Sequence, residues 1–389
     1  MIKKNELPEG WKIKRFEKVL DFEKKSKHRA GDGQKKGQYK FFTSSNVQNK
    51  FIDDFTYTGE HLIFGTGGNP SIHYCNENFS TSADCFVVGL KEPSILLKYV
   101  YYYFIANIHL LEEGFRGIGL KHISKAYMQK IYVSYPENIK IQEKIVQILE
   151  KTEELKNLRV QAHNWIDEYL KSLFLEMFGD PAINPKNFDV VKLKTLYSKK
   201  KAGTKCGPFG SALKKKEYVN SGIPVWTMDN IQDHEFSETG CLHITEEKFR
   251  KLEPYSAVKG DIIISRAGTV GKMCIVNSDK KNAIISTNLI RLSLDETKIL
   301  PIYFVLLMSL FKGRVGDLKT GEDGSYTFMN TTVLNDLEIP LPPTELQKQF
   351  AVLIHQIKTV KNLQEESRIQ IDNLFNALMQ KTFRGELIC

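Results

Sequence analysis

The sequence predicts an α+β fold in which one unit occurs twice, so that two similar globular domains are separated by two long helices. Three observations support this prediction. Short motifs, which we call stations, recur in the same order in the two halves, and each copy ends in a long amphipathic segment. Short apolar runs between turn residues fill the rest. The expected boundaries are a first domain at 1–140, a central helix at 141–180, a second domain at 181–343 and a C-terminal helix at 344–389.

The repeat extends from the entrance of each half to its final helix. Pro8 to Phe16 has the pattern of Pro185 to Leu193, and Gly59 to Phe64 resembles Gly260 to Ser265 at an offset of 201. Later matched stations are Leu90 with Leu294, Tyr99 with Tyr303, Pro136 with Pro342, Gln142 with Gln347, and Phe178 with Phe383. Seven stations in one order indicate an internal duplication with pseudo-two-fold character and a mostly antiparallel sheet in each copy.

The long segments are expected to pair with one another. A helix over 141–178 would be about 57 Å long at 1.5 Å per residue, which is more than one small domain can bury. The 3-4 spacing of its apolar residues is typical of a coiled coil, although the stripe could also pack only as local core. The predicted seam is Ile145, Ile148, Leu155, Tyr169, Leu173, Phe350, Leu353, Ile357, Leu374 and Leu378. Thr344 and Gln347 are spaced for a capping box at the second helix.

Composition places the chain among ordinary globular proteins. Its 389 residues are 41% hydrophobic and 26% charged, and the six cysteines are scattered without a C-x-x-C pair. We therefore expect neither a disulfide framework nor a zinc site, and a reducing cytoplasm is the simplest location. The polar N-terminus does not resemble a signal peptide, and no apolar run is long and uncharged enough to predict a membrane span.

The positive charge is concentrated on the two domains. The chain has a net charge of +9, of which residues 1–140 contribute +6 and residues 181–343 contribute +5, while the two helices contribute −3 and +1. Two basic domains predict a protein that binds a polyanion at two places, although each basic run could also be a solvated surface. The candidate DNA-binding residues are Lys24, Lys25, Lys27, Arg29, Arg116, Lys121, Lys199, Lys200, Lys201, Lys214, Lys215, Lys216, Arg266 and Lys272.

No motif predicts catalysis by this chain. The run from Gly268 to Met273 fails the P-loop pattern, because Arg266 occupies the earlier glycine position and a methionine follows Lys272. The two Asn-Pro pairs lack the following proline and aromatic residue of an amino-methyltransferase loop, and no histidine pair has zinc-ligand spacing. We therefore predict no catalytic residue, no metal site and no cofactor bound by this chain.

A duplicated basic module with a long helix after each copy resembles the specificity subunit of type I restriction-modification systems. The resemblance is carried by Leu7 to Trp11, Gly207 to Leu213, Gly222 to Pro224 with Asn230, and Ile339 to Pro343 with Gln347. It implies two target recognition domains separated by two helices packed antiparallel. Each domain would read half of a split double-stranded DNA target through the major groove, and the helices would set the gap and bind two methyltransferase subunits.

The resemblance also implies where the chemistry resides. S-adenosylmethionine, ATP and magnesium would be bound by partner methyltransferase and motor-nuclease subunits rather than by this chain. Arg266 opposite Gly65 in the other copy predicts unlike half-sites and an asymmetric target. Two alternatives stay open: the recognition part of a fused type II restriction-methylation enzyme or a solitary methyltransferase, and a coiled-coil adaptor that reads no DNA.

Overall fold

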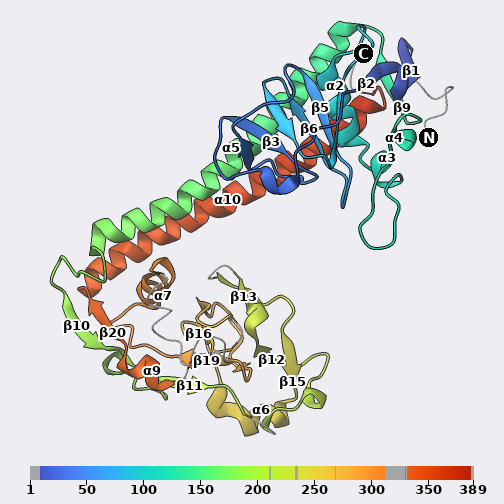
Figure 1. Ribbon diagram of the computed structural model, residues 1–389. Coiled ribbons are helices and arrows are strands. Elements are labelled where there is room, and N and C mark those ends of the chain that lie inside the picture. Colours follow the sequence, from blue (N-terminus) through green and yellow to red (C-terminus); the bar gives the residue numbers. More distant parts are fainter. Residues whose placement is uncertain are drawn as a thin grey trace. The chain divides into compact units, whose positions relative to one another are not determined.

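The computed structural model describes residues 9–209, 212–232, 235–267, 269–311, 329 and 331–386. The chain divides into two compact units, of which unit 1 comprises Met1–Ala162 with Leu363–Cys389 and unit 2 comprises His163–Asn362. Each unit contains one globular module together with part of both long helices, α5 (Ile139–Phe178) and α10 (Thr344–Phe383) (Figure 1). Both helices have 40 residues.

Unit 1 contains three small sheets. An antiparallel ribbon of β1 and β9 joins the start of the module to its end. A four-stranded antiparallel sheet has the order β2-β8-β5-β6, and a three-stranded sheet has the order β4-β3-β7, in which β3 and β7 are parallel. The strands are β1 Trp11–Arg15, β2 Leu20–Phe22, β3 Tyr39–Phe42, β4 Lys50–Ile52, β5 His61–Gly65, β6 Ile72–Cys75, β7 Phe79–Thr81, β8 Cys85–Leu90 and β9 Tyr132–Pro136. The short helices are α1 Phe16–Val19, α2 Leu97–Ala106, α3 His109–Glu112, α4 Lys125–Met128 and the 3₁₀ turn η2 Ala30–Asp32.

Unit 2 repeats this topology and adds an antiparallel pair, β13 with β14. The ribbon is β10-β20, the four-stranded sheet is β11-β19-β16-β17, and the three-stranded sheet is β15-β12-β18 with β12 and β18 parallel. The strands are β10 Asp189–Lys192, β11 Thr204–Cys206, β12 Ile223–Trp226, β13 Ile231–Gln232, β14 Glu235–Phe236, β15 Leu242–Ile244, β16 Ile262–Ser265, β17 Met273–Ile275, β18 Ile284–Ile285, β19 Leu289–Leu292 and β20 Glu338–Leu341. The helices are η3 Leu193–Leu196, η5 Lys215–Glu217, η6 Met228–Asn230, α6 Glu246–Leu252, η7 Glu253–Tyr255, α7 Pro301–Leu310 and α9 Thr331–Asp336. The predicted α+β fold with a duplicated, mostly antiparallel module is confirmed.

Strands β5 and β16 are equivalent, but the sequence offset of 201 between them is wrong by one residue. Phe64 and Ile264 each face the main core of their module, whereas Ile63 and Ile263 face the smaller core on the other side of the sheet. The structural offset is therefore 200. A shift of one residue would place every side chain of the strand on the opposite face. The sequence could not resolve this because both strands are apolar on both faces.

The corrected offset changes the counterpart of Arg266. Gly65 corresponds to Ser265, and Thr66 corresponds to Arg266. The Thr66 carbonyl accepts a hydrogen bond from the Ile123 amide, and the Arg266 carbonyl accepts one from the Met329 amide, both at 3.0 Å. The two modules therefore differ by threonine against arginine at this loop position.

A buried glutamine joins each module to its long helix. The Leu96 amide donates to Gln142 Oε1 at 2.8 Å, and Gln142 Nε2 donates to the carbonyls of Ser94 and Pro136, both at 2.9 Å. Gln347 makes the matching three bonds. Its Oε1 accepts from the Leu300 amide, and its Nε2 donates to the carbonyls of Lys298 and Pro342. Both glutamines are fully buried. The predicted capping box at Thr344 is wrong, because the Gln347 side chain binds the start of α7 instead.

Within each unit the two long helices pack antiparallel. In unit 1, Lys156 of α5 forms an ion pair with Asp372 of α10 at 3.0 Å, and its ammonium lies 4.6 Å from the Phe375 ring centroid. In unit 2, Lys361 pairs with Asp167 at 3.3 Å. The rings of Phe174 and Phe350 lie 5.7 Å apart in the same unit. Residue numbers therefore increase along one helix as they decrease along the other.

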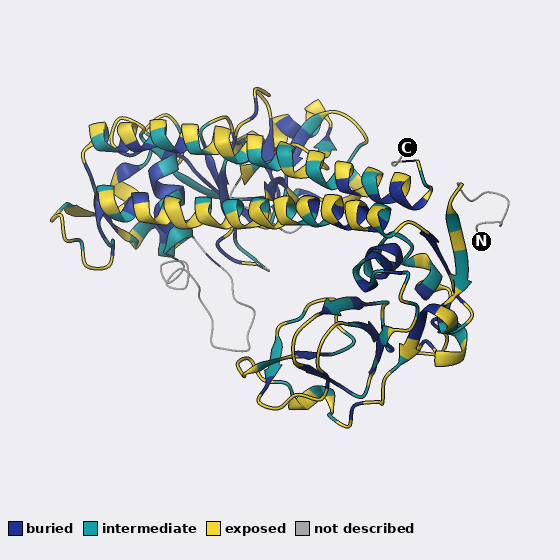
Figure 2. Cartoon of the chain, turned by 90° about the horizontal axis from the view of Figure 1, so that it is seen from above, coloured by how far each residue is buried: buried dark blue, intermediate teal, exposed yellow. Residues whose placement is uncertain are grey.

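Only part of the predicted seam is buried between the helices and their modules. Ile145, Leu173 and Phe350 are buried, and Leu353, Ile357 and Leu378 are partly buried. The remaining four predicted seam residues are Ile148, Leu155, Tyr169 and Leu374, and all four are exposed. Figure 2 shows exposed residues recurring along both long helices. Each helix carries a second apolar stripe at nearly the same spacing, so the sequence could not say which stripe is covered. Among the described residues, no helix combines the length and apolarity needed to cross a membrane.

Candidate nucleic-acid interface

In unit 1, the first basic run lies on an extended segment that follows β2. Lys24, Lys25, Lys27 and Arg29 are all exposed, and none of them forms an ion pair with another residue in the part of the chain that the structure describes. The backbone beneath them is fixed. The Tyr57 hydroxyl donates to the Lys24 carbonyl at 2.8 Å, and the amide of residue 83 donates to the carbonyl of residue 28 at 2.7 Å. The segment therefore presents uncompensated cations on an ordered support.

The run Lys214–Lys216 adjoins the equivalent turn in unit 2. Arg29 and Lys214 each precede a 3₁₀ turn, and each donates its amide to the carboxylate three residues later, Asp32 at 2.7 Å and Glu217 at 2.6 Å. Both turns lead into the central strand of the three-stranded sheet. The sequence repeat did not reveal this match because the surrounding loops differ in length and composition. Two modules of one topology thus carry exposed cations at the same point.

The run Lys199–Lys201 is only partly free. Lys199 and Lys200 are exposed, but Lys201 forms an ion pair with Asp261 at 2.5 Å. Asp261 is buried and also accepts from the Ser293 hydroxyl at 2.7 Å. Lys201 is therefore committed to holding this segment against the sheet, and it is the weakest of the predicted DNA contacts. The sequence could not indicate this pairing because Asp261 lies 60 residues away.

Arg266 lies at the start of the turn between β16 and β17 and stacks on an aromatic ring. Its guanidinium carbon is 4.6 Å from the centroid of the Phe209 ring, and Phe209 is itself exposed. Lys272, at the other end of this turn, is exposed and donates its amide to the Ser265 hydroxyl at 3.0 Å. Stacking restricts the arginine, which is half-buried, and its Nη1 is buried without a hydrogen-bond partner among the described residues. The rest of the planar group can donate hydrogen bonds, as recognition of a base or phosphate requires.

Phe209 was not among the sequence candidates, although its signal was present in the Gly-Pro-Phe run. Gly207 donates its amide to the Leu289 carbonyl at 2.9 Å, so the run begins against β19. A Cβ at Gly207 would overlap the carbonyl oxygen of Ser286, so only glycine fits this close approach. The glycine therefore allows the chain to place Phe209 beside Arg266.

The remaining predicted contacts, Arg116 and Lys121, lie on an exposed loop of unit 1. They flank residues 117–120, and their side chains are exposed. In the described residues, no group of three or more histidine, cysteine or acidic side chains is arranged to hold a metal ion. The candidate residues of both modules thus present exposed cations, and unit 2 adds the exposed ring of Phe209 beside Arg266.

The long helices expose apolar residues at matching positions. Leu155, Leu158 and Tyr169 of α5 are exposed, and the residues 205 positions later in α10 are also apolar and exposed. Those counterparts are Val360, Leu363 and Leu374. Recurrent exposure of large apolar side chains is typical of surfaces that contact another protein. Both copies of the repeat have kept this feature.

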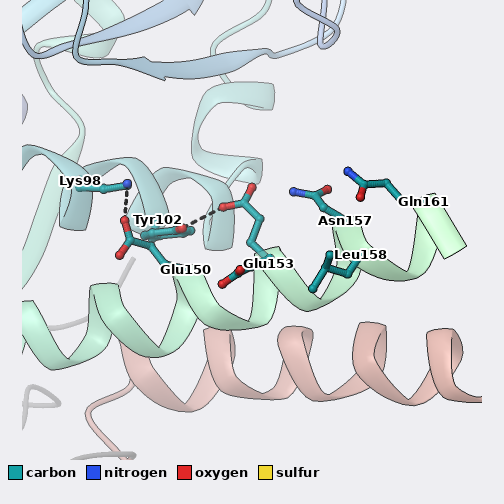
Figure 3. Close-up of a pocket in the computed structure, with 8 residues that line it drawn as sticks. Lys98, Tyr102, Glu150, Glu153, Asn157, Leu158 and Gln161 are labelled. Atoms are coloured by element: carbon teal, nitrogen blue, oxygen red, sulfur yellow. Dashed lines mark hydrogen bonds and ion pairs between the residues drawn. The ribbon is translucent and has the colours of Figure 1, made fainter.

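An acidic groove lies beside this stripe in unit 1 (Figure 3). It lies between α2 and α5, where Lys98 forms an ion pair with Glu150 and the Tyr102 hydroxyl donates to Glu153 at 2.8 Å. Burial and the nearby Glu153 carboxylate raise the pKa of Tyr102, so this hydroxyl stays protonated at neutral pH. The groove is lined by Lys98, Tyr102, Glu150, Glu153, Glu154, Asn157, Leu158 and Gln161. At the positions of Glu150 and Glu153, α10 has His355 and Lys358, so the two copies differ in charge here.

Comparison with known protein families identifies the duplicated module. The model of the type I restriction modification DNA specificity domain matches residues 8–163 and 185–373, which is one match for each half of the chain. The chain belongs to the type I specificity subunit family. The two matches coincide with the two copies of the repeat, so the duplication predicted from the sequence is a property of this family's domain.

Specificity subunits of distant organisms match this chain over most of its length. The MjaVIII specificity subunit of Methanocaldococcus jannaschii is 20% identical over 98% of this chain and 94% of its own length. The EcoBI specificity subunit of Escherichia coli is 20% identical over 89% of this chain and 77% of its own length. A putative specificity subunit of Haemophilus influenzae is 22% identical over 84% of this chain and 82% of its own length.

Solved structures share the fold. The S subunit of a type I restriction-modification system from M. genitalium is 17% identical, with a TM-score of 0.58 and coverage of 96% of both chains. A chain from a structural study of complex assembly and conformational transition of the type I system is 15% identical, with a TM-score of 0.60 and coverage of 98% of this chain and 99% of its own. At this identity the likeness extends to the fold alone.

Proposed function

We propose that this chain reads an asymmetric, bipartite double-stranded DNA target, with one recognition module on each half-site through the major groove. The observation that carries the proposal is that Lys24–Arg29 and Lys214–Lys216 adjoin equivalent turns, with Arg29 and Lys214 at the same position, on two modules of one topology. Exposed cations on fixed loops suit phosphate contacts, which fix the register of a protein on DNA. The difference between Thr66 and Arg266 supports two unlike half-sites.

The long helices are proposed to set the gap between the half-sites. Each helix is continuous over 40 residues, and a continuous helix varies in length far less than a flexible linker. We further propose that the exposed apolar stripe binds two methyltransferase subunits, one for each copy of the repeat. Exposed apolar residues at the same positions of α5 and α10 support two similar docking surfaces.

We assign the chemistry to partner subunits. Methyltransferase subunits would hold S-adenosylmethionine, and motor-nuclease subunits would hold ATP and magnesium for cleavage. We also propose a cytoplasmic location, because five cysteines of the described residues are free thiols, as is usual in a reducing compartment.

Mapping of methylated bases after reconstitution tests the proposal. The chain is combined with its partner methyltransferase subunits and incubated with genomic DNA and S-adenosylmethionine. The methylated positions are then sequenced. We expect methylated adenines in a two-part, asymmetric motif with a fixed gap, and no methyl transfer by the chain alone. Methyl transfer by the chain alone would support a solitary methyltransferase, and absence of any enriched motif would support an adaptor that reads no DNA.

A further inference from the structure

The loop of residues 116–122 forms a narrow projection from unit 1, which we call the finger. Arg116 and His122 exchange both backbone hydrogen bonds at 2.9 Å and so close its base. The Gly68 amide donates to the Lys121 carbonyl at 3.0 Å, and the amide of residue 123 donates to the carbonyl of residue 66 at 3.0 Å. These bonds hold the finger to the turn that follows β5.

The tip of the finger is apolar and very thin. Ile118 is 108% exposed relative to a reference residue, and Leu120 is 68% exposed. Gly117 and Gly119, which flank Ile118, have φ angles of +142° and +86° and carry no side chain that could cover it. Single exposed apolar residues are ordinary on protein surfaces. Here, however, two exposed apolar residues lie together on one closed loop beside glycines. A loop this thin can enter a space that is too narrow for a bulkier one.

The chain around the finger is basic. Residues 114–130 contain four lysines and arginines and no acidic residue, and the two exposed glutamates Glu112 and Glu113 directly precede them. Arg116 and Lys121 at the base of the finger are exposed, so an apolar tip lies between two cations. A DNA groove has the complementary arrangement, since phosphates form its rims and stacked bases form its floor. An acidic protein surface with an apolar pocket would match the same features, and the variants described below separate that alternative from DNA insertion.

We propose that Ile118 inserts into the minor groove of the half-site read by unit 1 and partly unstacks a base step, while Arg116 and Lys121 bind the flanking phosphates. Apolar wedge residues that enter the minor groove kink DNA in this way. The insertion rests on the proposed function, because it requires that the module binds duplex DNA. It adds a contact that reads how easily a base step is deformed rather than its hydrogen-bonding edge.

Fluorescence of 2-aminopurine tests the insertion. The full chain with its methyltransferase subunits is bound to a duplex enriched from a random library, in which each adenine of the half-sites is replaced in turn by 2-aminopurine. Methyltransferases flip their target base out of the stack, so the methylated adenines are scored separately. At the remaining positions, we expect fluorescence to rise several-fold at one step with the wild-type chain. Ile118→Ser should abolish the rise and weaken binding by about tenfold to a hundredfold, the range expected for losing one buried apolar side chain.

Matched variants separate the possible failures. Ile183→Ser changes an isoleucine that is 75% exposed outside the finger and should leave both signals unchanged, whereas Ile118→Leu should retain them. If the wild-type chain enriches a motif but Ile118→Ser binds it with the same affinity and fluorescence, the insertion is wrong while the proposed function stands. If Ile118→Ser loses the methyltransferase subunits instead, the finger is a protein contact and the insertion is also wrong. If no motif is enriched, the proposed function itself fails.

Discussion

Replacement of Gln142 by methionine should loosen unit 1 without changing unit 2. The substitution keeps the length of the side chain but removes three hydrogen bonds, to the Leu96 amide and to the carbonyls of Ser94 and Pro136. Because Gln142 is fully buried, these three backbone groups would be left without partners and without water. Each unsatisfied buried group costs about 1–3 kcal/mol, so for three groups we expect unit 1 to lose about 3–9 kcal/mol of its free energy of unfolding.

Hydrogen exchange with urea unfolding measures this loss and locates it. In Gln142→Met, amides of α2 and β9 should exchange faster by at least a hundredfold, since 1.4 kcal/mol is about a factor of ten. Amides of α7 and β20 should be unaffected. Gln347→Met should give the reverse pattern, because Gln347 makes the matching bonds in unit 2.

Gln147 provides the matched control, because it is an exposed glutamine on the same helix. Gln147→Met should change the unfolding free energy by less than about 0.5 kcal/mol, as is usual for surface substitutions. Equal effects of Gln142→Met and Gln147→Met would refute the argument that these bonds attach the module to the helix. Faster exchange in both units from Gln142→Met alone would refute the argument that the two attachments act separately.

Three further predictions concern binding and assembly. Replacement of Lys214–Lys216 by alanine should weaken DNA binding for all sequences and reduce the slope of log affinity against log salt by about two to three. Filter binding in a salt series measures both effects. Loss of preference at one base pair, with the slope intact, would contradict phosphate contact. Inserting about seven residues at the middle of both α5 and α10 should widen the gap of the methylated motif by about 10 Å, or about three base pairs, and an unchanged gap would show that the helices are not the ruler. Leu158→Glu should reduce co-purification of methyltransferase subunits at least tenfold relative to Gln161→Glu, a control on the same helix, and equal recovery would remove the stripe as a docking surface.

The duplication could be predicted from the sequence because a near-constant offset between matched residues reveals it. Gln142 with Gln347 and Tyr99 with Tyr303 recur at nearly constant offsets, and the structure gives each pair the same hydrogen-bonding role. These residues are buried at the junction of module and helix, where few substitutions fit. The long helices were equally clear from their apolar periodicity.

The seam and the candidate site were harder to predict because both depend on contacts made in three dimensions. Leu155 and Tyr169 have seam spacing, yet they belong to a second stripe that is exposed. Lys201 lies in a basic run but is neutralised by the distant Asp261. Phe209 gains significance only through its contact with Arg266. None of these partners lies near its residue in the sequence.

The paired strands at the foot of each module have a consequence for inheritance. The chain enters the first module through β1 and leaves it through β9, where Trp11 lies opposite Pro136, so both junctions are neighbours. The second module has the same arrangement, with Asp189 opposite Leu341. A recombination event between such junctions could replace a whole module while the frame that joins it to the helices is preserved. A lineage could in this way acquire a new recognition sequence in one step, while the long helices and their contacts stay the same.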